Sequence, residues 1–283
     1  MADIDLEPLR HAGVRIGQTE DLGAADGLAQ DTFLDAEDPT VARAAVAGLL
    51  SGMGLDYCLQ SVEGRRKRLL IADMDSTIIN VECIDELADF AGVKTQVSEI
   101  TERAMRGELD FETALRQRVA MLKGLPLTDL QRAYDERVRL NPGARTLVRT
   151  MTADGAKAFL VSGGFSFFTR RVAEAAGFDA QRANTLIEAG DGLAGTVGEP
   201  ILGREAQLAA LKEEAAKLGI PLCATLAVGD GANDLAMIEA AGLGVAYRAK
   251  PIVAARAHAK IDYADLTALL YFQGYRADEF VTD

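Results

Sequence analysis

The stretch Leu69-Leu70-Ile71-Ala72-Asp73-Met74-Asp75-Ser76-Thr77 decides the fold of this 283-residue chain. Its first four residues are apolar, which is typical of a short strand buried on both faces of a parallel sheet. Two carboxylates and two hydroxyls follow almost at once. A strand that ends in such polar residues places them at the carboxyl edge of its sheet, where open α/β proteins bind their ligands.

Two more apolar segments downstream end in the same way. Ala156–Val161 is followed by Ser162-Gly163-Gly164, and Thr225–Val228 is followed by Gly229-Asp230-Gly231-Ala232-Asn233-Asp234. The last predicted strand is Leu243–Tyr247, and segments with helical spacing alternate with the strands: Phe165–Ala176, Gln207–Leu218 and Asn233–Ala241. This alternation predicts an α/β fold with a doubly wound parallel sheet. The three polar loops should therefore converge on one crevice.

The remaining segments predict additions to this core. Residues 82–140 have a helical pattern without an intervening strand, which predicts a helical cap inserted between residues 67–81 and residues 141–283 of the core. Leu186–Val197 contains a Gly-Asp-Gly turn between apolar stretches and predicts a hairpin. Residues 1–66 predict a small N-terminal α/β domain.

Within that N-terminal domain, the pattern predicts two short strands, Gly13–Gly17 and Leu55–Val62, around an Ala-rich helix from Pro39 to Met53. Asp38 precedes the proline at the first turn, so we expect it to cap this helix. The stretch Glu63–Arg68 is basic. In so acidic a chain, we expect a linker or a solvated strand entrance there rather than a nucleic-acid patch.

Composition argues against several classes of protein. The formal net charge of −13 argues against nucleic acid or an anionic membrane as a partner. No apolar run approaches the roughly 18 residues of a membrane span, and the acidic start is unlike a secretory signal. The three cysteines are widely spaced, which suggests reduced thiols and a cytoplasmic protein. The two histidines lie in no catalytic motif.

The expected crevice gathers four carboxylates, from Asp73, Asp75, Asp230 and Asp234. These groups repel one another unless a divalent cation neutralises them, and hard oxygen ligands suit Mg²⁺. The glycine-rich and hydroxyl-rich loops offer N–H and O–H donors that suit phosphate oxygens. A hard cation beside an anion cradle predicts phosphoryl transfer, whereas the sequence has no P-loop motif for a nucleotide.

These motifs carry a resemblance to a known family. Residues 73–77 resemble the first motif of the haloacid dehalogenase superfamily, Asp-x-Asp-x-Thr, while Ser162 and residues 229–234 match its second and fourth motifs. Within the superfamily the chain is similar to the phosphoserine phosphatases, on Glu82, the segment Phe111–Val119 and Ala249-Lys250-Pro251. The resemblance covers roughly residues 68–270. It implies a core with a helical cap of the C1 type.

The resemblance also implies roles for the acidic residues. Asp73 would attack phosphorus and become a phosphoryl-aspartate, and Asp75 would protonate the leaving oxygen and later activate water. Mg²⁺ would be held by Asp73, Asp230 and the backbone carbonyl of Asp75, with support from Asn233 and Asp234. Taken singly, a carboxylate at a strand end also suits a helix cap, and Asp234 in particular opens a predicted helix.

Substrate contacts would come from the cap. The resemblance implies that Glu82 receives the ammonium group of the substrate and that Arg118 receives its carboxylate through a bidentate guanidinium. Met105 and Phe111 would close over the serine carbons and exclude water. Helix packing alone would also explain these two apolar residues, and a solvated helix surface would explain the two charged ones.

The phosphoryl group would be bound by Ser162 and Gly163. The family places a lysine from its third motif beside the nucleophile, but this chain has Gln207 at that position. A neutral amide brings no positive charge, and the loss of one electrostatic donor costs on the order of 10²–10³ in rate. Arg204 lies one helical turn earlier and could reach the same face, with Lys212 a weaker substitute.

The resemblance implies hydrolysis of O-phosphoserine to serine and phosphate, the last step of serine biosynthesis. Two alternatives stay open at this point. One is a phosphatase or phosphotransferase acting on another small amino-acid phosphate, and the other is a weakly active phosphoserine-binding protein, because of Gln207. Residues 1–66 fit a reduced regulatory domain of the ACT type, a scaffold or a dimer surface, so a homo-oligomer is compatible with the sequence.

Overall fold

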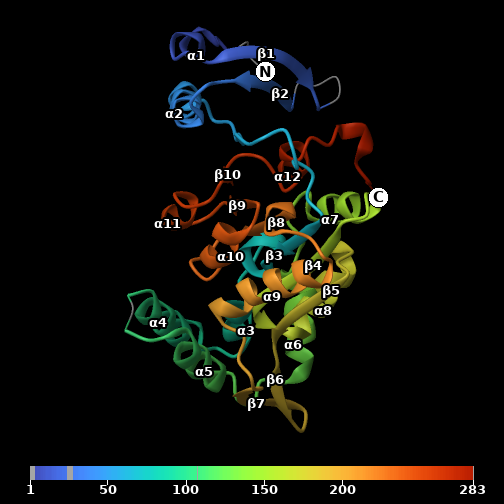
Figure 1. Ribbon diagram of the computed structural model, residues 1–283. Coiled ribbons are helices and arrows are strands. Elements are labelled where there is room, and N and C mark those ends of the chain that lie inside the picture. The colour runs from blue at the N-terminus through green and yellow to red at the C-terminus, as the bar shows by residue number, and fades with distance from the viewer. Residues whose placement is uncertain (1–3, 24–27, 107, 283) are drawn as a thin grey trace.

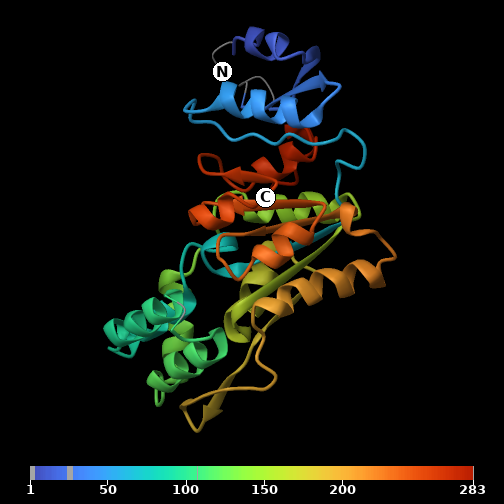
Figure 2. The same cartoon turned by 60° about the vertical axis from the view of Figure 1, so that its left-hand side comes forward.

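The computed structural model describes residues 4–23, 28–106 and 108–282 of the chain. An N-terminal unit lies at one end, the helices α4 and α5 lie at the other, and a sheet with its flanking helices lies between them (Figure 1). Figure 2 shows the same three parts of the molecule after a rotation of 60°. No helix in the described ranges is long and apolar enough to cross a membrane.

The central sheet has six parallel strands in the order β10-β9-β8-β3-β4-β5. Their bounds are Leu69–Ala72 (β3), Lys157–Phe165 (β4), Ala180–Asn184 (β5), Thr225–Gly229 (β8), Leu243–Tyr247 (β9) and Ala259–Ile261 (β10). In register, Ala72 lies beside Leu160 on one side and Val228 on the other. The carboxyl ends of β3, β4 and β8 are therefore level, and the predicted parallel α/β fold is confirmed.

Helices cover both faces of this sheet because the side chains of its strands alternate. Leu70 and Ala72 point into one apolar core, whereas Leu69 and Ile71 point into the other. The first core is closed by α7 (Ala144–Ala153), α8 (Ser166–Ala176) and α12 (Ala268–Phe272). The second is closed by α9 (Arg204–Lys217) and α10 (Leu235–Ala240), and α11 (Pro251–Ala254) follows β9.

The helical insertion follows β3 and consists of α3 (Cys83–Phe90), α4 (Lys94–Met105), α5 (Phe111–Met121) and α6 (Leu127–Arg137). An isolated bridge between Ile79 and Leu140 joins the two ends of this segment. The predicted hairpin is present as β6 (Leu186–Ala189) and β7 (Gly192–Val197), and it packs against α5. The backbone N–H of Gly124 donates to the carbonyl of Leu193 at 2.8 Å.

The N-terminal unit contains α1 (Glu7–His11), β1 (Arg15–Asp21), β2 (Gln30–Asp35) and α2 (Pro39–Leu50). The strands pair antiparallel and pack with both helices around a small apolar cluster. Asp38 caps α2 as predicted, accepting a hydrogen bond from the N–H of Thr40 at 2.8 Å.

Several predictions about strands were wrong. Leu55–Val62 forms no strand and runs as a linker, whereas β2 pairs with β1 instead. The first strand begins at Arg15 rather than Gly13, because Gly13 turns the chain with a positive φ of 78°. β4 continues four residues past Val161, and β10 follows the strand that was predicted to be the last.

Candidate active site

The carboxyl ends of β3 and β8 bring the predicted acidic residues together. Carboxylate oxygens of Asp73, Asp230 and Asp234 all lie within 4.8 Å of one another. Asp73 is 4% exposed and Asp234 fully buried. The hydroxyl of Thr77 donates to Asp230 Oδ1 at 3.0 Å, and the N–H groups of Asp230 and Gly231 donate to Asp234 Oδ2 at 3.1 and 2.9 Å. The structure thus brings three of the four predicted carboxylates into one cluster, and the fourth, Asp75, lines the same cleft.

The loops fit together only because two positions lack a side chain. A Cβ atom on Gly164 would lie 2.7 Å from Oδ2 of Asp75, and one on Gly229 would overlap the carboxylate of Asp234. Ser76 also turns the chain after β3 with a φ of 56°, in the left-handed region. These close approaches bring the carboxylate of Asp75 against β4, which carries Ser162, and that of Asp234 against the end of β8.

Burial dominates the electrostatics of this cluster. It raises the pKa of Asp73 well above its usual range, and the neighbouring charge of Asp234 adds to the effect. Burial, followed by the charge of Glu82, raises the pKa of Asp75 to about 8. Burial raises the pKa of Asp234 to about 7 and that of Asp230 to about 6. Deprotonation of the metal-free cluster is therefore unfavourable.

A divalent cation fits this set of donors. The clustered ligand atoms are carboxylate oxygens, which are the hard ligands that Mg²⁺ prefers, and they converge within one coordination sphere. No histidine or cysteine belongs to the cluster among the described residues, so the donor set does not suit zinc or copper. The residues present therefore fit Mg²⁺.

Gln207 occupies the centre of the site and is 2% exposed. Its Nε2 donates to Asp73 Oδ1 at 3.1 Å and to Asp234 Oδ1 at 2.6 Å, so the amide bridges the two carboxylates. Its Oε1 is buried without a hydrogen-bond partner in the described part of the chain. The substitutes suggested by the sequence are wrong, since Arg204 and Lys212 are exposed and neither lines the cleft. They lie on the solvent side of α9, whereas Gln207 faces the sheet.

A cleft of about 450 Å³ opens between these loops and the cap. Half of its 18 lining residues were predicted from the sequence, and the structure brings the following predicted residues to it: Asp73, Asp75, Glu82, Phe111, Arg118, Ser162, Gly163, Asp230 and Asn233. Asp234 and Gln207 lie beneath the floor rather than in the lining. Of Met105, the structure describes the end of α4 but not the side chain.

The cap residues in the cleft are poised for polar ligands. Nε of Arg118 donates to the carbonyl of Ala114 at 3.4 Å and Nη1 to Thr101 Oγ1 at 3.4 Å, and no carboxylate among the described residues pairs with the guanidinium. Burial lowers the pKa of Arg118, and the charge of Asp85 opposes the shift. Glu82 Oε1 accepts a hydrogen bond from the hydroxyl of Ser76 at 2.6 Å.

Donors for an anion lie on the opposite wall. Ser162 Oγ accepts from the N–H of Gly164 at 2.9 Å, which leaves its own hydrogen free to donate into the cleft. Asn184 Nδ2 fixes the loop by donating to the carbonyl of Gly163 at 2.8 Å. The ring of Phe111 closes over Gly163, where an added Cβ would lie 3.1 Å from Cζ.

Asp85 and Thr101 also line the cleft and carried no role in the sequence-based prediction. Asp85 lies one turn after Glu82 on α3, Thr101 holds Arg118, and Lys250 faces Asp230. The spacing of Glu82 and Asp85 on one helix face was a usable signal for the first. Thr101 lies on a separate helix, so no local pattern could connect it with Arg118.

Comparison with known proteins agrees with this geometry. A family model described as haloacid dehalogenase-like hydrolase matches residues 70–239, and a second model of the same description matches residues 208–272. The phosphoserine phosphatase of Streptomyces coelicolor is 43% identical over 239 residues, which cover 84% of this chain and 58% of that protein. The phosphoserine phosphatase of Polaromonas sp. is 48% identical over 72% of this chain and 88% of its own length.

Solved structures give the same result. A HAD family hydrolase from Salmonella enterica superposes with a TM-score of 0.82 at 32% identity, covering 94% of this chain and 92% of its own. A phospho-aspartyl intermediate analogue of a phosphoserine phosphatase superposes with a TM-score of 0.68 at 40% identity, covering 73% of this chain and 99% of its own. With its sheet, its cap and its acidic cluster in this arrangement, the chain belongs to the haloacid dehalogenase-like hydrolase family.

Proposed function

We propose that this protein is a Mg²⁺-dependent phosphomonoesterase that hydrolyses O-phosphoserine to serine and phosphate through a phosphoryl-aspartate on Asp73. The observation that carries the proposal is the position of Asp73, which forms part of the acidic cluster and also lines a cleft whose other wall offers Arg118 and Glu82. Relatives named phosphoserine phosphatase over most of the chain support the choice of substrate.

Two carboxylates would divide the chemistry. An oxygen of Asp73 would attack phosphorus in line, forming an O–P bond as the bond from phosphorus to the serine oxygen breaks. Asp75 would give its proton to that departing oxygen. In the metal-free protein, burial raises the pKa of Asp75 to about 8, and this upward direction supports its role as general acid. In the second half, Asp75 would take a proton from the water that attacks the phosphoryl-aspartate.

The metal would be held by Asp73, Asp230 and the backbone carbonyl of Asp75, with Asn233 and Asp234 in support. When bound, Mg²⁺ would neutralise the carboxylates and polarise the phosphoryl oxygens. Asp234 is itself fixed by the N–H of Gly231 at 2.9 Å and by Asn233 Nδ2 at 2.9 Å, which supports a positioning role.

The amino-acid part of the substrate would lie against the cap. Arg118 would bind its carboxylate, since the guanidinium is buried and already oriented by Thr101. Glu82 would bind its ammonium group, while Ser162 and the N–H of Gly163 would bind the phosphoryl oxygens. Phe111 would cover the serine carbons, and we keep the same expectation for Met105.

A second candidate is a protein that binds phosphoserine but turns it over slowly. The observation in its favour is Gln207, a neutral amide that bridges Asp73 and Asp234 where the family has a lysine. Lys250 lines the cleft and lowers the pKa of Asp230 through its charge, so one cation does face the metal site. It is exposed, which weakens its field at the phosphoryl group.

The substrate assignment can be tested on a panel of phosphorylated metabolites. Phosphate release would be measured from O-phosphoserine, O-phosphohomoserine and glucose 6-phosphate, each with Mg²⁺ and with a chelator. We expect O-phosphoserine to have the highest kcat/KM and the chelator to abolish turnover. A preference for the sugar phosphate would refute the substrate class. Tight binding of phosphoserine by calorimetry, together with turnover near background, would favour the second candidate.

The cellular setting follows from weaker observations. The three cysteines are free, which supports a reducing compartment, and we propose the cytoplasm. The net charge of −13 supports a small-molecule partner over nucleic acid or an anionic membrane. We propose residues 1–66 as a separate small domain, and a homo-oligomer remains compatible with its exposed strands.

A further inference from the structure

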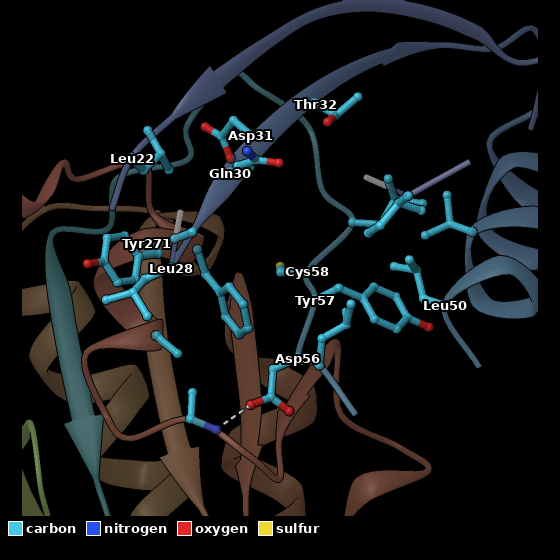
Figure 3. Close-up of a pocket in the computed structure, with 18 of the residues that line it drawn as sticks. Leu22, Leu28, Gln30, Asp31, Thr32, Leu50, Asp56, Tyr57, Cys58 and Tyr271 are labelled. Atoms are coloured by element: carbon cyan, nitrogen blue, oxygen red, sulfur yellow. Dashed lines mark hydrogen bonds between the residues drawn. The ribbon is translucent and has the colours of Figure 1, made fainter. Parts of the chain in front are cut away.

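A second cavity, larger than the candidate active-site cleft, lies elsewhere in the described part of the chain. A space of about 810 Å³ lies between the N-terminal unit and the C-terminal part of the core, at the opposite end from the cap. Figure 3 shows its walls, which include Leu22 from the N-terminal unit, Leu50 from α2, Tyr57 from the linker and Tyr271 from α12. Its volume falls within the range of about 300–1,000 Å³ that small-molecule sites occupy.

Each of the four charged side chains that the structure describes in the lining has a partner. Arg65 pairs with Asp31 through both terminal nitrogens, and its Nε donates to the carbonyl of Phe272 at 2.9 Å. Asp56 accepts three backbone N–H groups, those of residues 262, 263 and 264, at 2.8, 3.1 and 2.8 Å. Asp265 accepts the N–H and the hydroxyl of Thr267. The described lining residues therefore offer no free charge to an ionic ligand.

The remaining lining is largely apolar. Leu28 lines the mouth of the cavity and is 72% exposed. Cys58 projects from the linker into the middle of the space in Figure 3. Burial raises the pKa of the Cys58 thiol to about 11, so this group is also uncharged at neutral pH.

We propose that this cavity is a binding site for an uncharged, apolar small molecule that contacts the N-terminal unit and the core together. Water makes few hydrogen bonds to apolar walls, whereas an apolar ligand would remove its own surface and that of the walls from solvent. Phosphoserine, serine and phosphate are excluded as occupants, because each carries charge that the lining cannot neutralise. The site is independent of the proposed function and would remain if that function were refuted.

The probe for a test is Nile red, a neutral apolar dye whose fluorescence rises in apolar surroundings, titrated into the full-length protein without substrate. We expect saturable binding at one site. Dye at about 100 times its Kd should raise the melting temperature by about 5 °C, the shift expected for a chain of this size.

Two pairs of variants locate the dye. Leu28→Asp places a charge at the mouth, and Cys58→Phe fills the middle; we expect the first to weaken binding at least tenfold and the second to abolish it. The matched controls are Ile187→Asp, on exposed β6, and Cys223→Phe, at an exposed cysteine of the core, and both should bind the dye like the parent.

Three outcomes would overturn the proposal. The first is the absence of saturable binding, and the second is binding that survives in both Leu28→Asp and Cys58→Phe when these variants melt cooperatively. The third is dye binding that falls as protein concentration rises, because a second copy of the chain would then cover the cavity. Should Cys58→Phe fail to fold, Leu28→Asp alone decides, since its side chain is exposed.

Discussion

Replacing Gln207 by lysine should increase the rate of phosphate release from O-phosphoserine. Nε2 of Gln207 lies 3.1 Å from Oδ1 of the proposed nucleophile Asp73 and 2.6 Å from Oδ1 of Asp234, so a lysine ammonium in the same place would contact both carboxylates. It would bring a full positive charge next to the phosphoryl group as negative charge shifts during transfer. The neutral amide supplies only a dipole.

The size of the gain follows from two estimates. Two unit charges about 4 Å apart interact by about 4 kcal/mol at an effective dielectric constant of about 20. In other enzymes, the loss of one preorganised hydrogen-bond donor to the transition state costs about 2.7–4 kcal/mol, or roughly 10²–10³ in kcat. We therefore expect kcat of Gln207→Lys to exceed that of the parent by roughly 10²–10³. The buried Oε1, which has no partner in the described chain, also disappears, which removes a cost of about 1–3 kcal/mol to folding.

The assay is steady-state phosphate release at saturating Mg²⁺, with melting temperature recorded for each variant. Gln207→Met keeps the size and neutrality of the side chain but not its hydrogen bonds, so it should show no gain. Gln18→Lys adds the same charge at an exposed position of β1 and controls for net charge. A folded Gln207→Lys with unchanged or lower kcat would refute the reasoning, because charge at this position would then not limit the rate.

Three further predictions concern the acidic cluster and the cap. Asp73→Asn should abolish both turnover and the phosphorylated intermediate while leaving the melting temperature equal or higher, because it removes one repelling carboxylate; residual turnover would count against Asp73 as nucleophile. Arg118→Ala should lower kcat/KM for O-phosphoserine by roughly 10–100-fold, the worth of a hydrogen bond to a charged group, but not for phosphoethanolamine, which lacks the carboxylate. In the metal-free protein, burial raises the pKa values of Asp75, Asp234 and Asp230 to about 8, 7 and 6. The folded state then binds more protons than the unfolded chain between about pH 4 and 8, so the free energy of unfolding should fall as pH rises through this window. Mg²⁺ should therefore raise the melting temperature more at pH 8 than at pH 5. An equal rise at both pH values would contradict this prediction.

The parts of the site that sequence could predict are those set by strand ends. Leu69–Ala72 and Leu243–Tyr247 are continuous apolar runs, and the structure has both strands at these bounds. Parallel strands in register bring the residues that follow them to one edge, which is why Asp73 and Asp230 could be expected to meet. Whether the side chain of Arg204 extends to the site could not be predicted from strand ends, because it depends on how α9 is rotated about its axis against the sheet.

The elements that sequence missed lack such a pattern. β5 reads Ala-Gln-Arg-Ala-Asn and lies at a sheet edge, and β10 has only three residues, so neither shows a buried apolar run. Leu55–Val62 has apolar residues like a strand, yet its polar groups bind the C-terminal loop, as Asp56 does, and its apolar ones face a cavity. In this last case the deciding partner, the loop of residues 262–264, lies more than 200 residues away in sequence.

The bridge between Ile79 and Leu140 has a consequence for how this family diversifies. The chain leaves the sheet and returns to it at neighbouring points, so the insertion is joined to the core at one place. The groups that would perform the chemistry come from the core, whereas Glu82 and Arg118, which would choose the substrate, come from the insertion. A shorter or different insertion at this junction would let the same reaction act on different substrates.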